Sequence, residues 1–267
     1  MITYLSLFKM RLTQGLQYRV AAFAGILTQF FWGFMYIMIY QAFYQSTNTI
    51  QPISLHQLIT TVWLQQSLLA LIMLWFRNNE IIKLITKGDI AYELCRPVDL
   101  YGIWFSRLAA QRLSSALLRF FPILLIAYFL PYPYNFSLPN NFVTFILFLI
   151  TLVLGLFIVI SLSMLIYISM FYTLSGVGSI LIFGVIGEFL AGLTIPIPLM
   201  PKTLIIITYL LPFRYTSDLP FRIYAGNIAY KEAIISIFVQ IFWIITLYII
   251  GKLWLKKALN KVVIQGG

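Results

Sequence analysis

Apolar residues occur along this chain in long continuous runs separated by shorter polar stretches. Six runs reach or approach about 20 residues, the length that a helix needs to cross the hydrocarbon of a bilayer. Continuous runs exclude membrane-spanning β-strands, in which apolar and polar residues alternate. The pattern therefore predicts an all-α integral membrane protein with six transmembrane helices, at residues 20–43, 58–76, 113–130, 142–172, 179–200 and 233–255.

The N-terminal segment has a different pattern. Tyr4, Leu5, Phe8 and Leu12 recur at helical spacing, and the basic residues lie elsewhere on the helical wheel. An amphipathic helix of this kind lies in the plane of the membrane interface. We therefore expect residues 1–19 to form an interfacial helix; the alternative is an early extension of the first transmembrane helix.

The segment between the fifth and sixth predicted spans is also membrane-associated without being long enough to cross. Residues 203–213 form an apolar run that is too short to span the hydrocarbon, and a turn-rich stretch follows it. We expect residues 201–232 to form a small extracellular cap, a short helical hairpin. The whole chain, residues 1–267, then makes a single transmembrane domain.

Composition and charge agree with this architecture. Of the 267 residues, 61% are hydrophobic and 9% are charged, with a mean hydropathy of +0.94. The net charge of +11 comes from Lys and Arg at the edges of the apolar runs. There they serve topology and lipid headgroups, and nucleic acid is not an expected partner. With one cysteine and one histidine, the chain holds no internal disulfide, and a zinc site is disfavoured.

The distribution of basic residues predicts the orientation. With the N-terminus inside, 13 Lys and Arg residues lie on the inner side and 4 on the outer side. Such an excess marks the cytoplasmic face. Both termini are therefore expected in the cytoplasm, which agrees with an even number of spans.

The loop between the second and third predicted spans, residues 78–101, carries a compact charged segment. Asn79 can cap a helix that has Glu80 in its first turn, Lys83 and Lys87 in its last turn, and Gly88 at its end. The isoleucines and leucine within it leave one face apolar. We interpret the loop as a capped amphipathic helix on the cytoplasmic face; the alternative is an ordinary solvated loop.

The stretch GDIAYELCRPVDLYGIWFSRLAAQR resembles the membrane subunits of bacterial ABC-type exporters of the type-2 permease class. More narrowly, it resembles the branch with an LxRP(V/I)(D/N) signature after the second span. The resemblance extends over the whole layout of spans, loop and cap. It implies a permease of the bacterial cytoplasmic membrane that is not itself an enzyme. Consistently, the chain contains no GxxxxGK(S/T) phosphate-binding loop.

The resemblance also implies partners and a mechanism. Two permease chains, identical or related, would form the pathway, and two separate ATP-binding cassette subunits would bind ATP and Mg²⁺ below it. Their closure on ATP would push the loop after the second span. The residues that this implies for coupling are Glu80, Lys83, Lys87, Asp89, Glu93, Arg96 and Asp99. We expect the first four to be surface contacts and the last three to pair locally at the base of the third span.

Glu188 is an ionisable residue in the middle of the fifth predicted span, where such residues are functional candidates. Gly184, Gly187 and Gly192 flank it and permit another helix to approach closely. Glu188 therefore has two interpretations. It is either a carboxylate on the substrate path, coupled to protons, or a structural hydrogen-bonding group at a subunit interface.

Three arginines recur near heptad spacing in the third predicted span, which would place them close to one helical face. Arg107 and Arg112 can reach the lipid phosphates of the inner leaflet by snorkelling. Arg119 lies deeper, so we expect it to contact protein; whether it pairs with Glu188 stays open. Polar residues within the spans, among them Gln29, Gln65 and Gln66, fit either a path or helix packing.

The sequence disfavours two other classes of function. A secondary transporter driven by an ion gradient through Glu188 predicts inverted repeats, and no convincing three-plus-three repeat is evident. An intramembrane enzyme needs clustered catalytic groups, and the single histidine, His56, lies at the outer mouth of the second span. We expect no catalytic, cofactor-binding or metal-binding residues in this chain. A drug, a lipid, a peptide and a polysaccharide precursor all fit as substrate.

Overall fold

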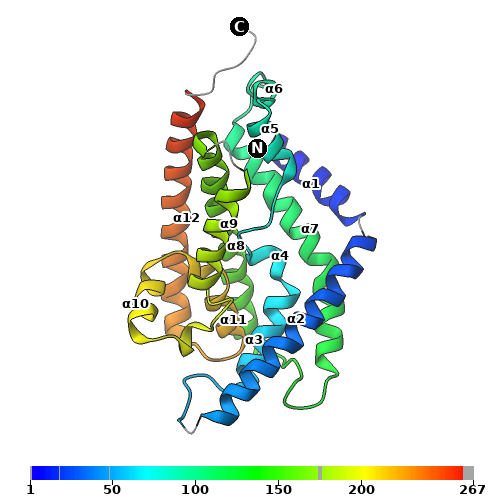
Figure 1. Ribbon diagram of the computed structural model, residues 1–267, viewed down its shortest axis with the longest axis vertical. Helices are drawn as coiled ribbons and strands as arrows, with labels where there is room; N and C mark the ends of the chain where they lie inside the picture. Colours follow the sequence, from blue (N-terminus) through cyan, green and yellow to red (C-terminus); the bar gives the residue numbers. More distant parts are fainter. Residues whose placement is uncertain (1, 18, 48, 174–175, 261–267) are drawn as a thin grey trace.

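The computed structural model describes residues 2–17, 19–47, 49–173 and 176–260, and every regular element in these ranges is helical. Within them, four helices are long and apolar enough to cross a membrane. They stand side by side as a bundle (Figure 1). These helices are α2 (Arg19–Ser46), α7 (Leu100–Tyr128), α8 (Phe142–Thr173) and α12 (Tyr230–Leu259).

The second and fifth predicted spans are shorter and broken. The second consists of α3 (Leu55–Ser67) and α4 (Leu69–Ile72), with extended backbone at Met73. The fifth is α9 (Gly176–Leu190), and it ends where Gly192 adopts a φ of +77°. Pro196 and Pro198 then keep the chain out of an α-helix. The structure thus confirms four of the predicted spans, and six stays a prediction.

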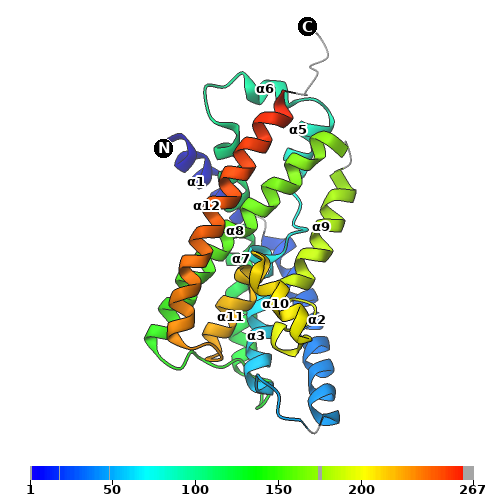
Figure 2. The ribbon, with the colours of Figure 1, turned by 90° about the vertical axis from the view of Figure 1, so that its left-hand side faces the viewer.

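Figure 1 shows α5 (Asn79–Thr86), α6 (Ile90–Leu94) and the last turns of α12 at one end of the bundle. In the opposite half lie α10 (Lys202–Leu210) and α11 (Asp218–Tyr224), together with the short 3-10 helices η1 (Ile197–Leu199) and η2 (Phe213–Thr216) (Figure 2). Between these ends, α8 carries many of the fully buried side chains. The loop therefore lies at one end of the molecule, and the predicted cap lies in the opposite half.

The helix α1 (Ile2–Leu16) packs along the first half of α7. The hydroxyl of Tyr4 accepts a hydrogen bond from the backbone N–H of Asp99 at 3.1 Å. Farther along α1, Gly15 lies so close to Ser114 that an added Cβ would collide with its side chain. Tyr4 and Phe8 contact the buried core, whereas Leu5 is exposed. Part of the predicted interfacial stripe therefore serves packing within the protein.

The predicted cap is partly embedded in the bundle. A Cβ at Gly155 of α8 would lie 2.9 Å from the backbone oxygen of Tyr215, so only glycine permits this approach. Gln240 of α12 donates from one nitrogen to the carbonyls of Thr151 and Tyr215, at 2.8 and 2.9 Å. The side chain of Arg214 is buried beside Asp218. A solvated cap would hold none of these groups out of water.

Candidate functional site

The loop between α4 and α7 contains a capped helix, as its sequence indicates. The cap is Asn78, whose side-chain oxygen accepts a hydrogen bond from the N–H of Ile81 at 3.0 Å. The expected cap, Asn79, is instead the first residue of α5. The helix ends at Thr86, and Gly88 two residues on has a φ of +77° that is favourable only for glycine. Its apolar face is buried through Ile81 and Ile85.

Two of the three residues expected to pair locally do so. Glu93 is buried, and its oxygens accept hydrogen bonds from Trp104 and Arg107, both at 2.7 Å. Asp99 caps α7 and lies 3.4 Å from the amine of Lys252. Arg96 is exposed and forms no ion pair with any residue in the described part of the chain. Glu93 and Asp99 therefore fasten the loop to the base of α7, and Arg96 does not.

Glu80, expected at the surface, is half exposed but already has partners within the chain. Its oxygens lie 2.8 Å from Arg11 of α1 and 3.7 Å from Arg107 of α7. It thus links three elements at one point. The exposed charged side chains of the loop that form no ion pair with described residues are Lys83, Lys87, Asp89 and Arg96.

A groove of about 280 Å³ lies on the outer side of this network. Three of the exposed residues, Lys83, Asp89 and Arg96, line it together with Glu80 and Arg107. Both signs of charge are therefore presented around one concave surface. Such a surface suits a charged element of another protein.

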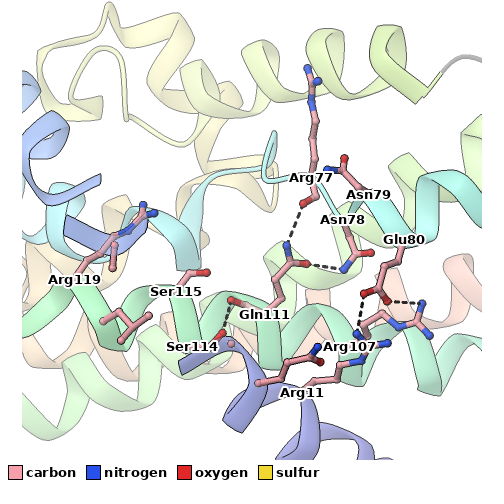
Figure 3. A pocket seen from close by; sticks show the side chains of 14 residues that line it. Arg11, Arg77, Asn78, Asn79, Glu80, Arg107, Gln111, Ser114, Ser115 and Arg119 are labelled. Carbon is pink, nitrogen blue, oxygen red and sulfur yellow. Dashed lines mark hydrogen bonds and ion pairs between the residues drawn. The ribbon is translucent and has the colours of Figure 1, made fainter. Parts of the chain in front are cut away.

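A cavity of about 520 Å³ lies between α1, the start of α5 and α7 (Figure 3). We call it the basic cavity, because Arg11, Arg77, Arg107 and Arg119 line it. Glu80 is the one acidic residue among the described side chains around it. In Figure 3, Arg119 stands apart from the cluster that Glu80 forms with Arg11 and Arg107. The charges of Arg11 and Arg107 are therefore balanced locally, and that of Arg119 is not.

A second cavity, of about 430 Å³, lies between α2, the broken α3–α4 unit and α9. We call it the polar cavity, because Gln29, Gln65, Gln66 and Glu188 line it. Arg119 lines this cavity as well as the basic cavity. The two cavities thus meet at Arg119.

Glu188 is partly buried, and its carboxylate accepts a hydrogen bond from the indole N–H of Trp75. The nearby glycines do permit a close approach, but within the chain. A Cβ at Gly184 would lie 3.0 Å from Trp75, and one at Gly187 would lie 2.2 Å from Leu74. These glycines therefore seat α9 on the extended segment that follows α4.

Arg119 has no carboxylate partner in the part of the chain that the structure describes, and Glu188 does not pair with it although both line the polar cavity. Its guanidinium lies against α2 at Gly25, where a Cβ would come within 2.6 Å of its central carbon. Its Nε is buried without a hydrogen-bond partner. Among the three arginines, Arg119 is the one with neither an ion pair nor a hydrogen bond to any residue in the described part of the chain.

The other two arginines do not reach for lipid, which corrects the snorkelling interpretation. Arg107 is bound by Glu93. Arg112 has no exposed surface and donates to the carbonyls of Ala70 and Met73, at 3.1 and 2.8 Å, and to Ser163 at 2.9 Å. It also turns away from the basic cavity, so the three arginines do not share one face. The helix α4 ends at Ile72, so the backbone carbonyls of Ala70 and Met73 lack partners from a continuing helix. Arg112 supplies the hydrogen bonds that these carbonyls need inside the membrane domain.

Some residues of the site were not anticipated. Arg11 and Arg77 belong to the 13 basic residues whose pattern indicates only topology, yet both line the basic cavity. Trp75 was not singled out, yet it holds Glu188. These residues come from separate elements, so no spacing along the chain could connect them.

Replacement of Glu188 separates its two interpretations. Glu188→Gln keeps an acceptor for Trp75, so we expect near-normal thermal stability in detergent together with poor transport. Glu188→Leu leaves the indole N–H unpaired, which is expected to cost about 1–3 kcal/mol of unfolding free energy. Trp75→Phe serves as the control, because its effect and that of Glu188→Leu should not add. Normal stability and transport in both Glu188 variants would leave the residue without a role.

Comparison with known proteins adds an independent finding. Residues 30–266 match the family model described as ABC-2 family transporter protein. The match includes the charged loop, the cap and most of the membrane-spanning helices. It leaves out α1 and the first turns of α2, and with them Gly25, Thr28 and Gln29 of the polar cavity. The comparison with curated proteins gave no match, and neither did the comparison with solved structures.

Proposed function

Because the chain belongs to the ABC-2 family of transporter proteins, we propose that it is the permease subunit of an ATP-driven exporter and works with separate ATPase subunits. Its membership makes it a multi-pass membrane protein and a transport subunit of an ABC transporter. The proposal includes export as the direction of transport, two ATP-binding cassette subunits, and a second permease chain that is identical or related. It also places the chain in the bacterial cytoplasmic membrane with both termini in the cytoplasm.

The observation that carries the coupling proposal is the loop of residues 78–101. It projects from one end of the bundle as two short helices (Figure 1). Four of its exposed charged residues have no ion-pair partner among the described residues: Lys83, Lys87, Asp89 and Arg96. At the same time, Glu80 and Glu93 bind it to α1 and α7. A partner that pushes on α5 and α6 therefore pushes directly on two other helices.

The pathway proposal follows from the two cavities. They lie one after the other beside α7, and Arg119 belongs to both. A movement of α7 caused by the loop would change the walls of both cavities together. Family membership favours this ATP-driven mechanism over ion-coupled transport through Glu188.

The proposal predicts where ATP is hydrolysed. The purified chain alone is expected to show no ATP hydrolysis above that of a mock purification, because the sequence has no phosphate-binding loop. A chain expressed with its proposed ATP-binding subunit is expected to purify as a complex that hydrolyses ATP. Robust hydrolysis by the isolated chain would refute the assignment as a permease subunit.

A further inference from the structure

The polar cavity has opposite charges on its walls that do not neutralise each other. Arg119 of α7 and Glu188 of α9 both line it, and no ion pair joins them. The seven Asp and Glu residues of the chain all lie in the described ranges, and none pairs with Arg119. A cationic side chain inside a membrane domain is costly without a counter-charge. The cavity therefore lacks an anion at Arg119.

The surroundings of Glu188 lack the complementary cation. Its one hydrogen bond in the described part of the chain comes from the neutral indole of Trp75. Trp32 and Tyr36 line the same cavity, so three aromatic rings stand around the space next to the carboxylate. Carboxylates and aromatic faces together attract ammonium groups. This side of the cavity is suited to a cation.

Neutral hydrogen-bonding groups cover the rest of the wall. The side chains of Gln29, Gln65 and Gln66 are buried there, and the amide oxygen of Gln29 has no partner. Buried amides without partners are unfavourable unless water or a ligand completes their hydrogen bonds. The cavity volume of about 430 Å³ is in the range of small-molecule sites.

We propose that the polar cavity binds a zwitterionic group, with a phosphate at Arg119 and an ammonium at Glu188, as in a phosphoethanolamine headgroup. The basic cavity opens onto the same arginine, which gives the anionic end a second approach to its site. The identification of this zwitterion as part of the transported molecule rests on the proposed export function. The binding site itself is independent of that function.

The test compares two lipids that share the phosphate and the acyl chains, one with an ammonium in its headgroup and one with a neutral glycerol in its place. The purified full-length chain is titrated with phosphatidylethanolamine and with phosphatidylglycerol of the same acyl chains, each presented in detergent micelles. The wild-type chain is expected to bind phosphatidylethanolamine at least about tenfold more tightly than phosphatidylglycerol. A hydrogen bond to a charged group contributes enough binding free energy for a tenfold difference in affinity. Equal affinity for the two lipids would overturn the proposal.

Two variants test which residue binds the ammonium and which binds the phosphate. Glu188→Gln is expected to abolish the preference for phosphatidylethanolamine, and Arg119→Gln is expected to weaken the binding of both lipids at least about tenfold. Matched controls are Glu232→Gln and Lys256→Gln, which remove one acidic and one basic charge far from the polar cavity. A preference that survives Glu188→Gln, or equal losses in the controls, would contradict the site.

A soluble probe distinguishes the source of the zwitterion. If O-phosphoethanolamine displaces the lipid from the wild-type chain, the headgroup alone is recognised and a soluble zwitterion is the natural ligand class. If it does not, while the preference between lipids holds, the ligand is the lipid itself. These binding measurements need neither ATP nor a partner subunit, so their outcome is independent of the ATP hydrolysis experiment.

Discussion

Replacing Arg112 by methionine is expected to lower the free energy of unfolding by on the order of 4 kcal/mol. The side chain is fully buried and donates three hydrogen bonds, two of them to backbone carbonyls at the break in α3–α4. Methionine has a similar volume but no donor, so the carbonyls of Ala70 and Met73 would lose a partner. Thermal unfolding in detergent, followed by tryptophan fluorescence, measures the loss.

Arg119→Met is the matched control for Arg112→Met. It removes the same group from the same helix, yet Arg119 forms no ion pair with any described residue. We expect its stability to lie within about 1 kcal/mol of the wild-type value. If both variants lose stability equally, Arg112 has no special role in holding the broken span.

Reversal of charge on α5 is expected to reduce transport at least about tenfold without affecting the fold. Lys83 and Lys87 are exposed, Lys83 in the last turn of α5 and Lys87 at its C-cap. The proposed ATPase contact would oppose these lysines with acidic groups, so the double variant Lys83→Glu, Lys87→Glu would bring like charges together. Such repulsion costs more than the ~1.4 kcal/mol that corresponds to tenfold. Transport by vesicles that contain the permease and its ATPase, made with each variant, measures the effect.

The control for this reversal is the pair Lys256→Glu, Lys257→Glu at the end of α12. These side chains are also exposed, and they lie at the same end of the molecule as α5 (Figure 1). We expect them to leave transport within about twofold of wild type, because they are outside the proposed contact. An equal loss in both pairs would mean that the general surface charge matters, and α5 would lose its assigned role.

Hydropathy predicted the long helices well, because a continuous apolar run of sufficient length has few alternatives in a membrane. It overestimated the length of the continuous helix in the second and fifth predicted spans. The backbone can leave the helix at Met73 because Arg112, 39 residues farther along, donates to its carbonyl. After α9, Gly192 and the prolines determine the end. Only the second of these causes is visible in the local sequence.

The charged side chains also divide into those that local sequence predicts and those that depend on distant residues. The cap, dipole and end of α5 follow from its own residues, and the sequence predicts them to within one position. The partners of Glu80 and Glu93 come from α1 and α7, 69 and 14 residues away. For Arg112, the heptad spacing suggested a shared face, but burial against α8 turned it elsewhere. Long-range pairing decides which charges remain free, and one-dimensional spacing does not report it.

Cysteine accessibility at position 83 tests the coupling account most directly. The native Cys95 is exposed and is first replaced by serine, so that Lys83→Cys carries the one thiol of the chain. Lys231→Cys in the same background is the control for the opposite side. The account predicts that an impermeant maleimide labels position 231 but not position 83 in sealed cells. Position 83 should be labelled after the membranes are opened, and less so when the ATPase is bound. Labelling of position 83 from outside sealed cells would contradict both the topology and the coupling role of α5.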